Sequence, residues 1–555
     1  MRKILLILLT QISISISAQL STVYSTTPIK NIDCDFYVNL INNKFYFQGS
    51  DPFVSGQGAE LFVSDSTEVG TVLVKNINPN SFGSSSPGNF TQLNSNSVLF
   101  TANDGTVGRE LWITDGTNAG TSLVKDIYPG SNNGAFEHFT RMGNAIYFMA
   151  NDGVDGNELW KSDGTTIGTQ LVKNINPTGN GMQIPVLLYS KYTAVVSNTL
   201  FFVASDGSTG FELYKTDGTT SGTLLVKDLY TGSQSSNPSN FVVVNNILYF
   251  TCTSANDGNE LWKTDGTTLG TVMVKDFSPL IGASSNPNYL VGLNNKLYFS
   301  ALVSNKTNLC VSDGTTIGTN TLYVAPNFNS EFCRLTKVDS SIYFFDRSTG
   351  VAPDYSLYKY DLPLNNTILV KSGLYGGTSG PVYQPTKEKA VSLNGRLYFT
   401  FDDFTNGDEL WESDGTTLGT KMITDIGVGP LTSWIDNLIP VSNGTNSRLY
   451  FISTKKTGLL YILPSAVTTN NNEIANSNHF SFYPNPSNET INVNFEEING
   501  FPVTLSVFDV SGKILMSSVV KESKTEMNIS HLAKGVYFVK VVSQNGVNTQ
   551  KLIIN

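Results

Sequence analysis

Short apolar segments, separated by turns rich in Gly, Asn, Asp and Ser, follow one another along most of the chain. Residues 247–250 (Ile-Leu-Tyr-Phe) and 260–262 (Glu-Leu-Trp) are typical of them. Segments this short, with aromatic and branched side chains, predict β-strands, and nothing longer than a turn has a helical pattern. The apolar residues stand in succession and not in strict alternation, which is typical of sheets buried on both faces. The pattern predicts an all-β fold.

One unit recurs along the chain, and its clearest copy lies at residues 110–127 (Glu-Leu-Trp-Ile-Thr-Asp-Gly-Thr-x-x-Gly-Thr-x-Leu-Val-Lys-Asp-Ile). Further copies start at residues 158, 212, 260 and 409, looser ones at 60 and 308, and a degenerate one at 356. The shared aspartates recur at spacings of 48 to 54 residues: Asp65, Asp115, Asp163, Asp217, Asp265, Asp313, Asp361 and Asp414. Each unit predicts four short strands: a Leu-Tyr-Phe strand, the Glu-Leu-Trp strand, the Leu-Val-Lys strand and a last strand such as residues 240–244. The Asp-Gly-Thr turn closes the second hairpin.

A four-stranded unit of this length fits the blade of a β-propeller better than a solenoid coil, whose repeats run roughly 20–35 residues. We therefore expect residues 19–465 to form a large β-propeller with eight or nine four-stranded blades. A ninth unit, at residues 448–462, lacks its Leu-Val-Lys strand, which residues 21–24 would supply if the two ends of the chain paired. An eight-bladed ring with an imperfect terminal hairpin is the alternative.

Composition and charge exclude several classes of protein. The 555 residues carry 35 Lys and Arg against 45 Asp and Glu, and this net charge of −10 argues against a nucleic-acid partner. The 4 cysteines, Cys34, Cys252, Cys310 and Cys333, are too sparse for a disulfide scaffold. Four buried thiols and one or two disulfides both remain open, with Cys310 and Cys333 the nearest pair in sequence.

The first 18 residues have the features of a secretion signal peptide. Arg2 and Lys3 form a basic region, residues 4–9 are aliphatic, and Ser17-Ala18 offers a small-residue cleavage site. No later segment approaches the length of apolar sequence that spans a bilayer, so no transmembrane segment is expected. The pattern predicts a chain that leaves the cytoplasm.

A polar linker at residues 466–478 separates the repeats from a tail at residues 479–555, whose pattern predicts a small β-sandwich of seven strands. Four segments of the tail resemble the type IX secretion C-terminal sorting domain (type A) of Bacteroidetes proteins: 482–487 (Phe-Tyr-Pro-Asn-Pro-Ser), 507–513, 532–540 and 551–554. The resemblance implies handling by the type IX secretion machinery, export through the outer membrane, removal of the tail, and release or attachment to surface polysaccharide. A secreted or outer-surface protein is the expectation.

The repeat itself resembles the Glu-Leu-Trp-x-x-Asp-Gly-Thr-x-x-Gly-Thr repeats of secreted bacterial proteins, a family label that carries little functional information. A catalytic centre is normally used once, so carboxylates present in most units are expected to be architectural; these include Glu60, Glu110, Glu158, Glu212, Glu260 and Glu409. Asp152 and Asp155, in an Asp-rich turn, are the best candidate calcium ligands, although an ordinary hairpin turn also accounts for them. No other cofactor is expected.

Catalytic motifs are lacking in the sequence. His138 is the single histidine of the repeat region, and no nucleophile motif lies near it. Specificity is expected where the repeat is broken: in the divergent units at residues 308–311 and 355–366, in the insert at residues 178–192, which contains Met182, Ile184, Leu187 and Tyr189, and at residues 375–383. Neutral drift is the alternative. We therefore expect a binding protein for a glycan or a cell-surface protein. A glycoside hydrolase or lyase, which needs only two carboxylates, and a structural surface component are the alternatives.

Overall fold

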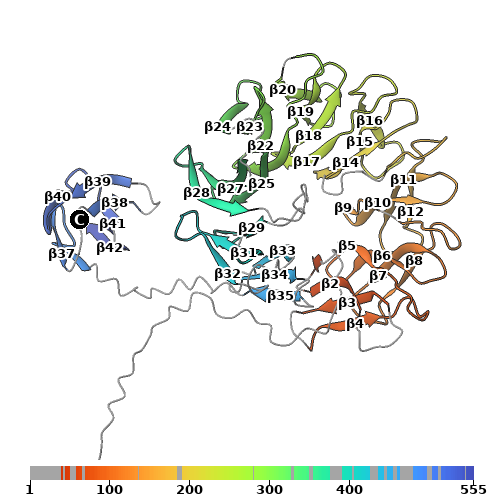
Figure 1. Cartoon of the computed structure of the whole chain (residues 1–555), viewed down its shortest axis with the longest axis horizontal. Coiled ribbons are helices and arrows are strands. Elements are labelled where there is room, and N and C mark those ends of the chain that lie inside the picture. The colour runs from red at the N-terminus through yellow and green to blue at the C-terminus, as the bar shows by residue number, and fades with distance from the viewer. Residues whose placement is uncertain are drawn as a thin grey trace, which may run out of the picture. The chain divides into compact units, whose positions relative to one another are not determined.

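The computed structural model describes residues 39–41, 44–50, 58–65, 69–135, 137–183, 191–278, 280–326, 331–348, 354–375, 390–402, 405–424, 435–442, 447–453, 459–462, 479–496, 503–509, 514–543 and 546–555. The predicted signal peptide, residues 21–24 and the predicted linker lie outside them. The described residues contain β-strands and no helix, which confirms the all-β prediction (Figure 1). Two compact units divide the chain, an N-terminal unit (Met1–Ala466) and a C-terminal unit (Val467–Asn555).

The N-terminal unit consists of consecutive antiparallel sheets, which we number 1 to 9 in chain order. Their first strands are β1 (Asn39–Ile41), β5 (Gly88–Gln92), β9 (Thr140–Met142), β13 (Thr193–Val196), β17 (Ser239–Val244), β21 (Asn288–Leu293), β25 (Glu331–Val338), β29 (Ala390–Leu393) and β33 (Ile435–Ser442). Their second strands are β2 (Lys44–Gly49), β6 (Val98–Asn103), β10 (Ala145–Asn151), β14 (Thr199–Ala204), β18 (Ile247–Ser254), β22 (Lys296–Val303), β26 (Ser341–Ser348), β30 (Arg396–Asp402) and β34 (Ser447–Ser453).

In most sheets the third strand carries the Glu-Leu-Trp motif or a close variant of it, and the fourth strand carries the Leu-Val-Lys motif or a close variant. The third strands are β3 (Glu60–Ser64), β7 (Arg109–Thr114), β11 (Asn157–Ser162), β15 (Glu212–Thr216), β19 (Gly258–Thr264), β23 (Lys306–Ser312), β27 (Asp354–Asp361), β31 (Asp408–Ser413) and β35 (Leu459–Ile462). The fourth strands are β4 (Val72–Lys75), β8 (Ser122–Lys125), β12 (Gln170–Lys173), β16 (Leu224–Lys227), β20 (Val272–Lys275), β24 (Asn320–Val324), β28 (Asn366–Tyr375) and β32 (Lys421–Thr424). One residue pair between β28 and β30 joins sheets 7 and 8.

The sheets do not coincide with the units of the sequence repeat. The last strand of each unit, such as β17, pairs with the apolar strand that follows it, and so it becomes the first strand of the next sheet. The reason is a tight turn at Asn245 and Asn246, whose φ angles of 52° and 59° are those of a type I′ turn. Such a turn reverses the direction of the chain within two residues, so β17 and β18 form an antiparallel hairpin.

Each apolar core of the N-terminal unit lies between two consecutive sheets. The core between sheets 4 and 5, for example, combines Phe201 and Leu213 with Phe241, Phe250 and Trp262. The first strands of consecutive sheets lie next to one another throughout the described part of the unit (Figure 1). A ring contact at 4.4 Å between Phe45 of β2 and Tyr450 of β34 makes the first and the ninth sheet neighbours as well.

Repeated polar bonds also join consecutive sheets. The lysine of the Leu-Val-Lys strand donates to a threonine backbone carbonyl in the next sheet, as Lys227 does to Thr271 at 2.8 Å. In the opposite direction, the hydroxyl of Thr268 donates to the backbone carbonyl of Val226 at 2.9 Å. The polar positions of the repeat therefore serve contacts between sheets, which explains why they recur.

The C-terminal unit has two sheets. One contains β36 (His479–Tyr483), β37 (Thr490–Glu496) and β40 (Lys524–Asn528), and the other contains β38 (Val503–Phe508), β39 (Ile514–Val520), β41 (Gly535–Ser543) and β42 (Gly546–Ile554). Both contribute to a single apolar core, in which Ile491 of the first sheet and Leu505 and Leu552 of the second are fully buried. These are the seven strands that the sequence predicts.

Candidate ligand-binding site

The repeated glutamates lie at the start of the third strands and are fully buried. We call the segment that leads from the fourth strand of one sheet to the first strand of the next a connector. Each glutamate accepts hydrogen bonds from a connector. Glu212 accepts hydrogen bonds from the backbone N–H of Leu229 and of Ser236, both at 2.9 Å, and from the Ser236 hydroxyl at 2.5 Å. Glu60 accepts equivalent bonds from Ile77 and Ser85. These carboxylates therefore have an architectural role.

The buried glutamates make the stability of the N-terminal unit depend on pH. Burial raises the pKa of Glu110, Glu158 and Glu260 from 4.5 to about 7, although hydrogen bonds from the connectors lower it. The folded state therefore binds protons more tightly than the unfolded chain, and this stabilisation is complete below pH 4.5 and lost as the pH rises through about 7. We expect a lower Tm of the N-terminal unit at pH 8 than at pH 5 in scanning calorimetry.

The matched control replaces all three residues with Gln, which cannot titrate, and should reduce the difference in Tm between the two pH values. A Tm that rises from pH 5 to pH 8 in the unmodified protein would contradict the role of burial.

The repeated aspartates hold the hairpin between the third and fourth strands. Asp217 accepts the backbone N–H of Thr219 at 2.9 Å and its hydroxyl at 2.7 Å. These bonds lower the pKa of the Asp217 carboxyl, and Gly218 has a φ of 92°, which suits glycine. Equivalent bonds occur at Asp115, Asp163, Asp265, Asp313 and Asp414. The aspartates thus stabilise the turns in which they lie.

Asp152 and Asp155, the predicted calcium ligands, lie in the turn between β10 and β11. Asp152 accepts the backbone N–H groups of Val154 and Asp155, at 2.9 Å and 2.8 Å. Asp155 accepts the Asn174 side-chain amide at 2.5 Å. Among the residues that the structure describes, no group of three or more His, Cys, Asp or Glu side chains could hold a metal ion. The calcium site stays a prediction.

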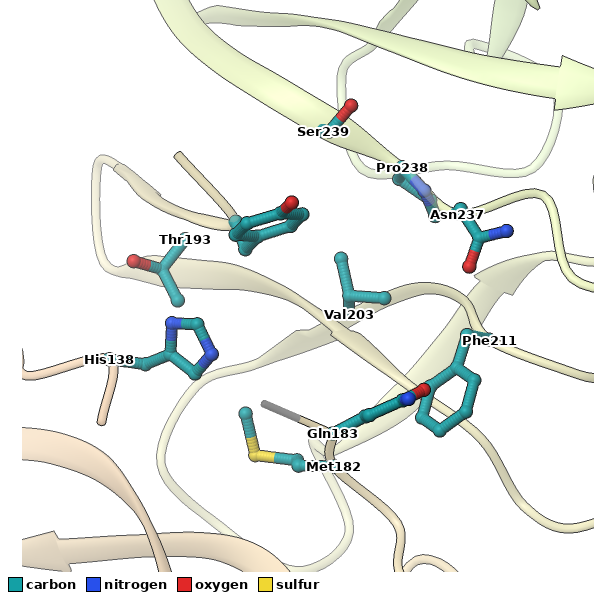
Figure 2. Close-up of a pocket in the computed structure, with 10 residues that line it drawn as sticks. His138, Met182, Gln183, Thr193, Val203, Phe211, Asn237, Pro238 and Ser239 are labelled. Atoms are coloured by element: carbon teal, nitrogen blue, oxygen red, sulfur yellow. The ribbon is translucent and has the colours of Figure 1, made fainter. Parts of the chain in front are cut away.

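A cavity of about 360 Å³, which we name pocket A, lies where the connectors meet around sheet 4 (Figure 2). This volume falls within the roughly 300–1,000 Å³ that is usual for small-molecule sites. Three consecutive connectors and the ends of two strands of sheet 4 line it: His138; Met182, Gln183 and Tyr192; Asn237, Pro238 and Ser239; and Thr193, Val203 and Phe211. The lining combines aromatic and aliphatic surface with amide and hydroxyl groups.

The described lining of pocket A carries no formal charge at neutral pH. The lining residues that the structure describes include no Lys, Arg, Asp or Glu. Burial lowers the pKa of His138 below its usual 6.5, so this imidazole is neutral there. The rings of His138 and Tyr192 meet edge to face at 6.0 Å, and Figure 2 shows the side chains of His138, Gln183 and Asn237 around one space. Such a site favours an uncharged ligand with both apolar and hydroxyl groups.

His138 occupies a position that repeats from sheet to sheet, at or just before the start of the first strand. Its φ of 66° is left-handed, and Asn89 and Asn240 have φ angles of 55° and 58° at the same position. Those asparagines suit this conformation and donate to a threonine of the second strand. Sheet 3 has Met149 in place of that threonine, so the structure puts His138 into pocket A instead.

Sequence reasoning identified part of pocket A. Met182 lies in the insert where the broken repeat predicts specificity, and His138 was noted as the single histidine of the repeats. Phe211 and Asn237 were missed, because both stand in ordinary copies of the unit. One feature of the sequence could have pointed to Phe211: it replaces the polar residue that precedes the motif glutamate in sheets 2, 3 and 5.

The two cysteine thiols that the structure describes are not reactive groups. Cys252 and Cys310 are free, fully buried cysteines, and burial raises the pKa of both. A disulfide between Cys310 and Cys333 is thus not formed in the structure. Cys34 and the side chain of Cys333 lie outside the described part of the chain.

Comparison with solved structures gives only distant similarity. PorZ, an essential surface component of the type IX secretion system of Porphyromonas gingivalis, is 11% identical over 93% of this chain and 75% of its own, with a TM-score of 0.33. A puromycin-hydrolyzing peptidase of Mycobacterium tuberculosis is 10% identical over 66% of this chain and 61% of its own, with a TM-score of 0.38. Scores this low bear on neither fold nor activity. No curated protein sequence matches the chain significantly.

The C-terminal tail does match a family model. Residues 481–555 match the secretion system C-terminal sorting domain, which confirms the sequence prediction for this tail. The described residues include no helix that is long and apolar enough to cross a membrane. Residues 481–555 are therefore a secretion system C-terminal sorting domain, and this tail indicates export by type IX secretion to the outer surface or beyond it.

Proposed function

We propose that this protein is an exported glycan-binding protein, a nine-bladed β-propeller with its ligand site in pocket A. The observation that carries the proposal is the lining of pocket A, whose described residues are uncharged and partly aromatic and include Met182 and Gln183 of the insert. The propeller is supported by the consecutive sheets, the cores between them, and the contact between Phe45 and Tyr450. Residues 21–24 would complete sheet 9.

The lining suits a sugar better than other ligands. A sugar ring presents a face of C–H groups and a rim of hydroxyls. The face would pack on the rings of Tyr192 and Phe211, and the hydroxyls would bond to the amides of Gln183 and Asn237. The neutral lining favours neutral sugars, because a charged ligand would lose its hydration without gaining an ion pair.

Binding is favoured over hydrolysis in this pocket. A glycosidase needs two carboxyl groups beside the scissile bond, and no carboxylate lines the described part of pocket A. The buried repeat glutamates are already bonded to connectors. A protein ligand and a purely structural role at the surface remain the competitors, and they predict no saturable binding of sugars.

A glycan array tests the proposal with the full-length protein. We expect saturable binding to a related set of neutral glycans, weakened at least about tenfold by Asn237→Gly, which keeps the left-handed backbone and removes the side chain. The matched control is Asn245→Gly, in the turn at the other end of the same sheet, where φ is 52°. Equal binding by both variants, or no binding by the unmodified protein, counts against pocket A. Repeating the array with EDTA tests calcium at Asp152 and Asp155.

A further inference from the structure

Pocket A has a structural counterpart over sheet 6, which we name pocket B. Its volume is about 150 Å³, and its lining includes Asn286, Asn288, Tyr289, Ser300, Thr307 and Phe332. Strand register relates the two pockets: Val203 pairs with Leu213 in sheet 4, and Ser300 pairs with Leu309 in sheet 6. Both leucines are the second residue of the repeat motif, so the two pockets occupy the same place in their sheets.

The equivalence extends to the other walls of the pockets. Four pairs of lining residues share a position in the repeat: Tyr192 with Tyr289, Val203 with Ser300, Phe211 with Thr307, and Pro238 with Phe332. Each pocket therefore combines a tyrosine at or beside the start of the first strand, a second ring on another wall, and asparagine side chains: Asn237 in pocket A, and Asn286 and Asn288 in pocket B. The described lining of pocket B, like that of pocket A, includes no charged residue.

The backbone at Tyr289 is left-handed, as it is at the same position of several other sheets. Tyr289 has a φ of 52°, at the position that Asn89 and Asn240 occupy in other sheets. A left-handed conformation is unfavourable for residues other than Gly and Asn, and Arg334 adopts it at the same position of sheet 7, with a φ of 57°. His138 of pocket A has the same strained position, with a φ of 66°. His138 and Tyr289 are thus kept at a cost in backbone energy.

We propose that pocket B is a second subsite, and that pockets A and B together bind one extended neutral polysaccharide chain. The proposal rests on the glycan-binding function proposed above. Stacked sheets lie about 10 Å apart, so we expect the pockets over sheets 4 and 6 to be separated by roughly 20 Å. A chain of several sugar units spans such a distance. Occupation of one pocket then raises the effective concentration of sugar at the other, so long chains bind more tightly than short ones.

Titration calorimetry of the full-length protein tests this inference. The probes are cello-, malto-, xylo-, manno- and laminari-oligosaccharides, from disaccharides to octasaccharides. We expect the longest members of a bound series to bind at least about tenfold more tightly than the disaccharide. Asn286→Gly and Tyr289→Leu should remove this gain and leave binding at pocket A unchanged. Asn286 has a φ of 46°, which glycine adopts readily, and leucine retains the apolar packing of Tyr289.

The matched control is Asn295→Gly, at the other end of sheet 6, where φ is 61°. This variant should bind every probe as the unmodified protein does. The second subsite would be overturned if affinity did not depend on chain length, Asn237→Gly lost binding and Asn286→Gly bound as the unmodified protein does. That result would leave the proposed function intact. Absence of binding by the unmodified protein to every series would overturn both.

Discussion

Replacing Glu212 with Ala should destabilise the N-terminal unit by about 3–5 kcal/mol, the largest effect that we expect from a single substitution. The substitution leaves two backbone N–H groups, of Leu229 and Ser236, and the Ser236 hydroxyl buried without their acceptor. Each such group costs about 1–3 kcal/mol. The connector between sheets 4 and 5 would lose its anchor. Urea denaturation followed by tryptophan fluorescence measures the change.

Glu212→Gln is the control for this experiment. Glutamine keeps the size of the side chain and one carbonyl acceptor, so we expect a smaller loss of about 1–2 kcal/mol. An Ala variant as stable as the unmodified protein would mean that the connector finds other acceptors. The anchoring role would then be wrong for this sheet.

Deletion of residues 481–555 should abolish export and leave the N-terminal unit in the periplasm. The tail is a sorting domain with its own apolar core, in which Ile491 and Leu552 are fully buried. Because the two units have separate cores, the N-terminal unit should fold without the tail. Cell fractionation, with immunoblots of medium, outer surface and periplasm, measures the distribution. We expect nearly all of the truncated protein in the periplasmic fraction.

Two controls make this result specific. Fusion of residues 467–555 to a periplasmic reporter should carry the reporter to the outer surface or the medium. Leu552→Asp should block export to the same degree as the deletion, because a buried charge disrupts the core that both sheets share. Efficient export of the truncated chain would show that the sorting signal lies elsewhere.

The sequence predicted those features that depend on neighbouring residues. The strands follow from short apolar segments, and the hairpin at Asp217 follows from Asp, Gly and Thr side chains that bond to their own turn. The seven strands of the C-terminal unit agree with the prediction for the same reason. The unit boundaries were misplaced, because the type I′ turn at Asn245 and Asn246 lacks the glycine that usually marks such turns.

The pockets could not be predicted, because they depend on distant segments. His138, Gln183 and Asn237 belong to three different connectors, and only the packing of consecutive sheets brings these connectors together. The repeat reveals which positions are equivalent in different sheets, but not which of them border an open space. The equivalence of Tyr192 and Tyr289 is therefore visible in the sequence, whereas the cavities beside them are not.

The amino-acid sequence by itself determined that this chain is an array of β-strands with a sorting tail. Both features reside in local motifs, whose chemistry acts over a few residues. The tertiary structure alone decided that the repeated glutamates anchor connectors, and that residues breaking the repeat gather in pocket A. Burial, hydrogen bonding between sheets and the shape of a cavity depend on contacts between segments far apart in the chain, and those contacts form only when the sheets pack.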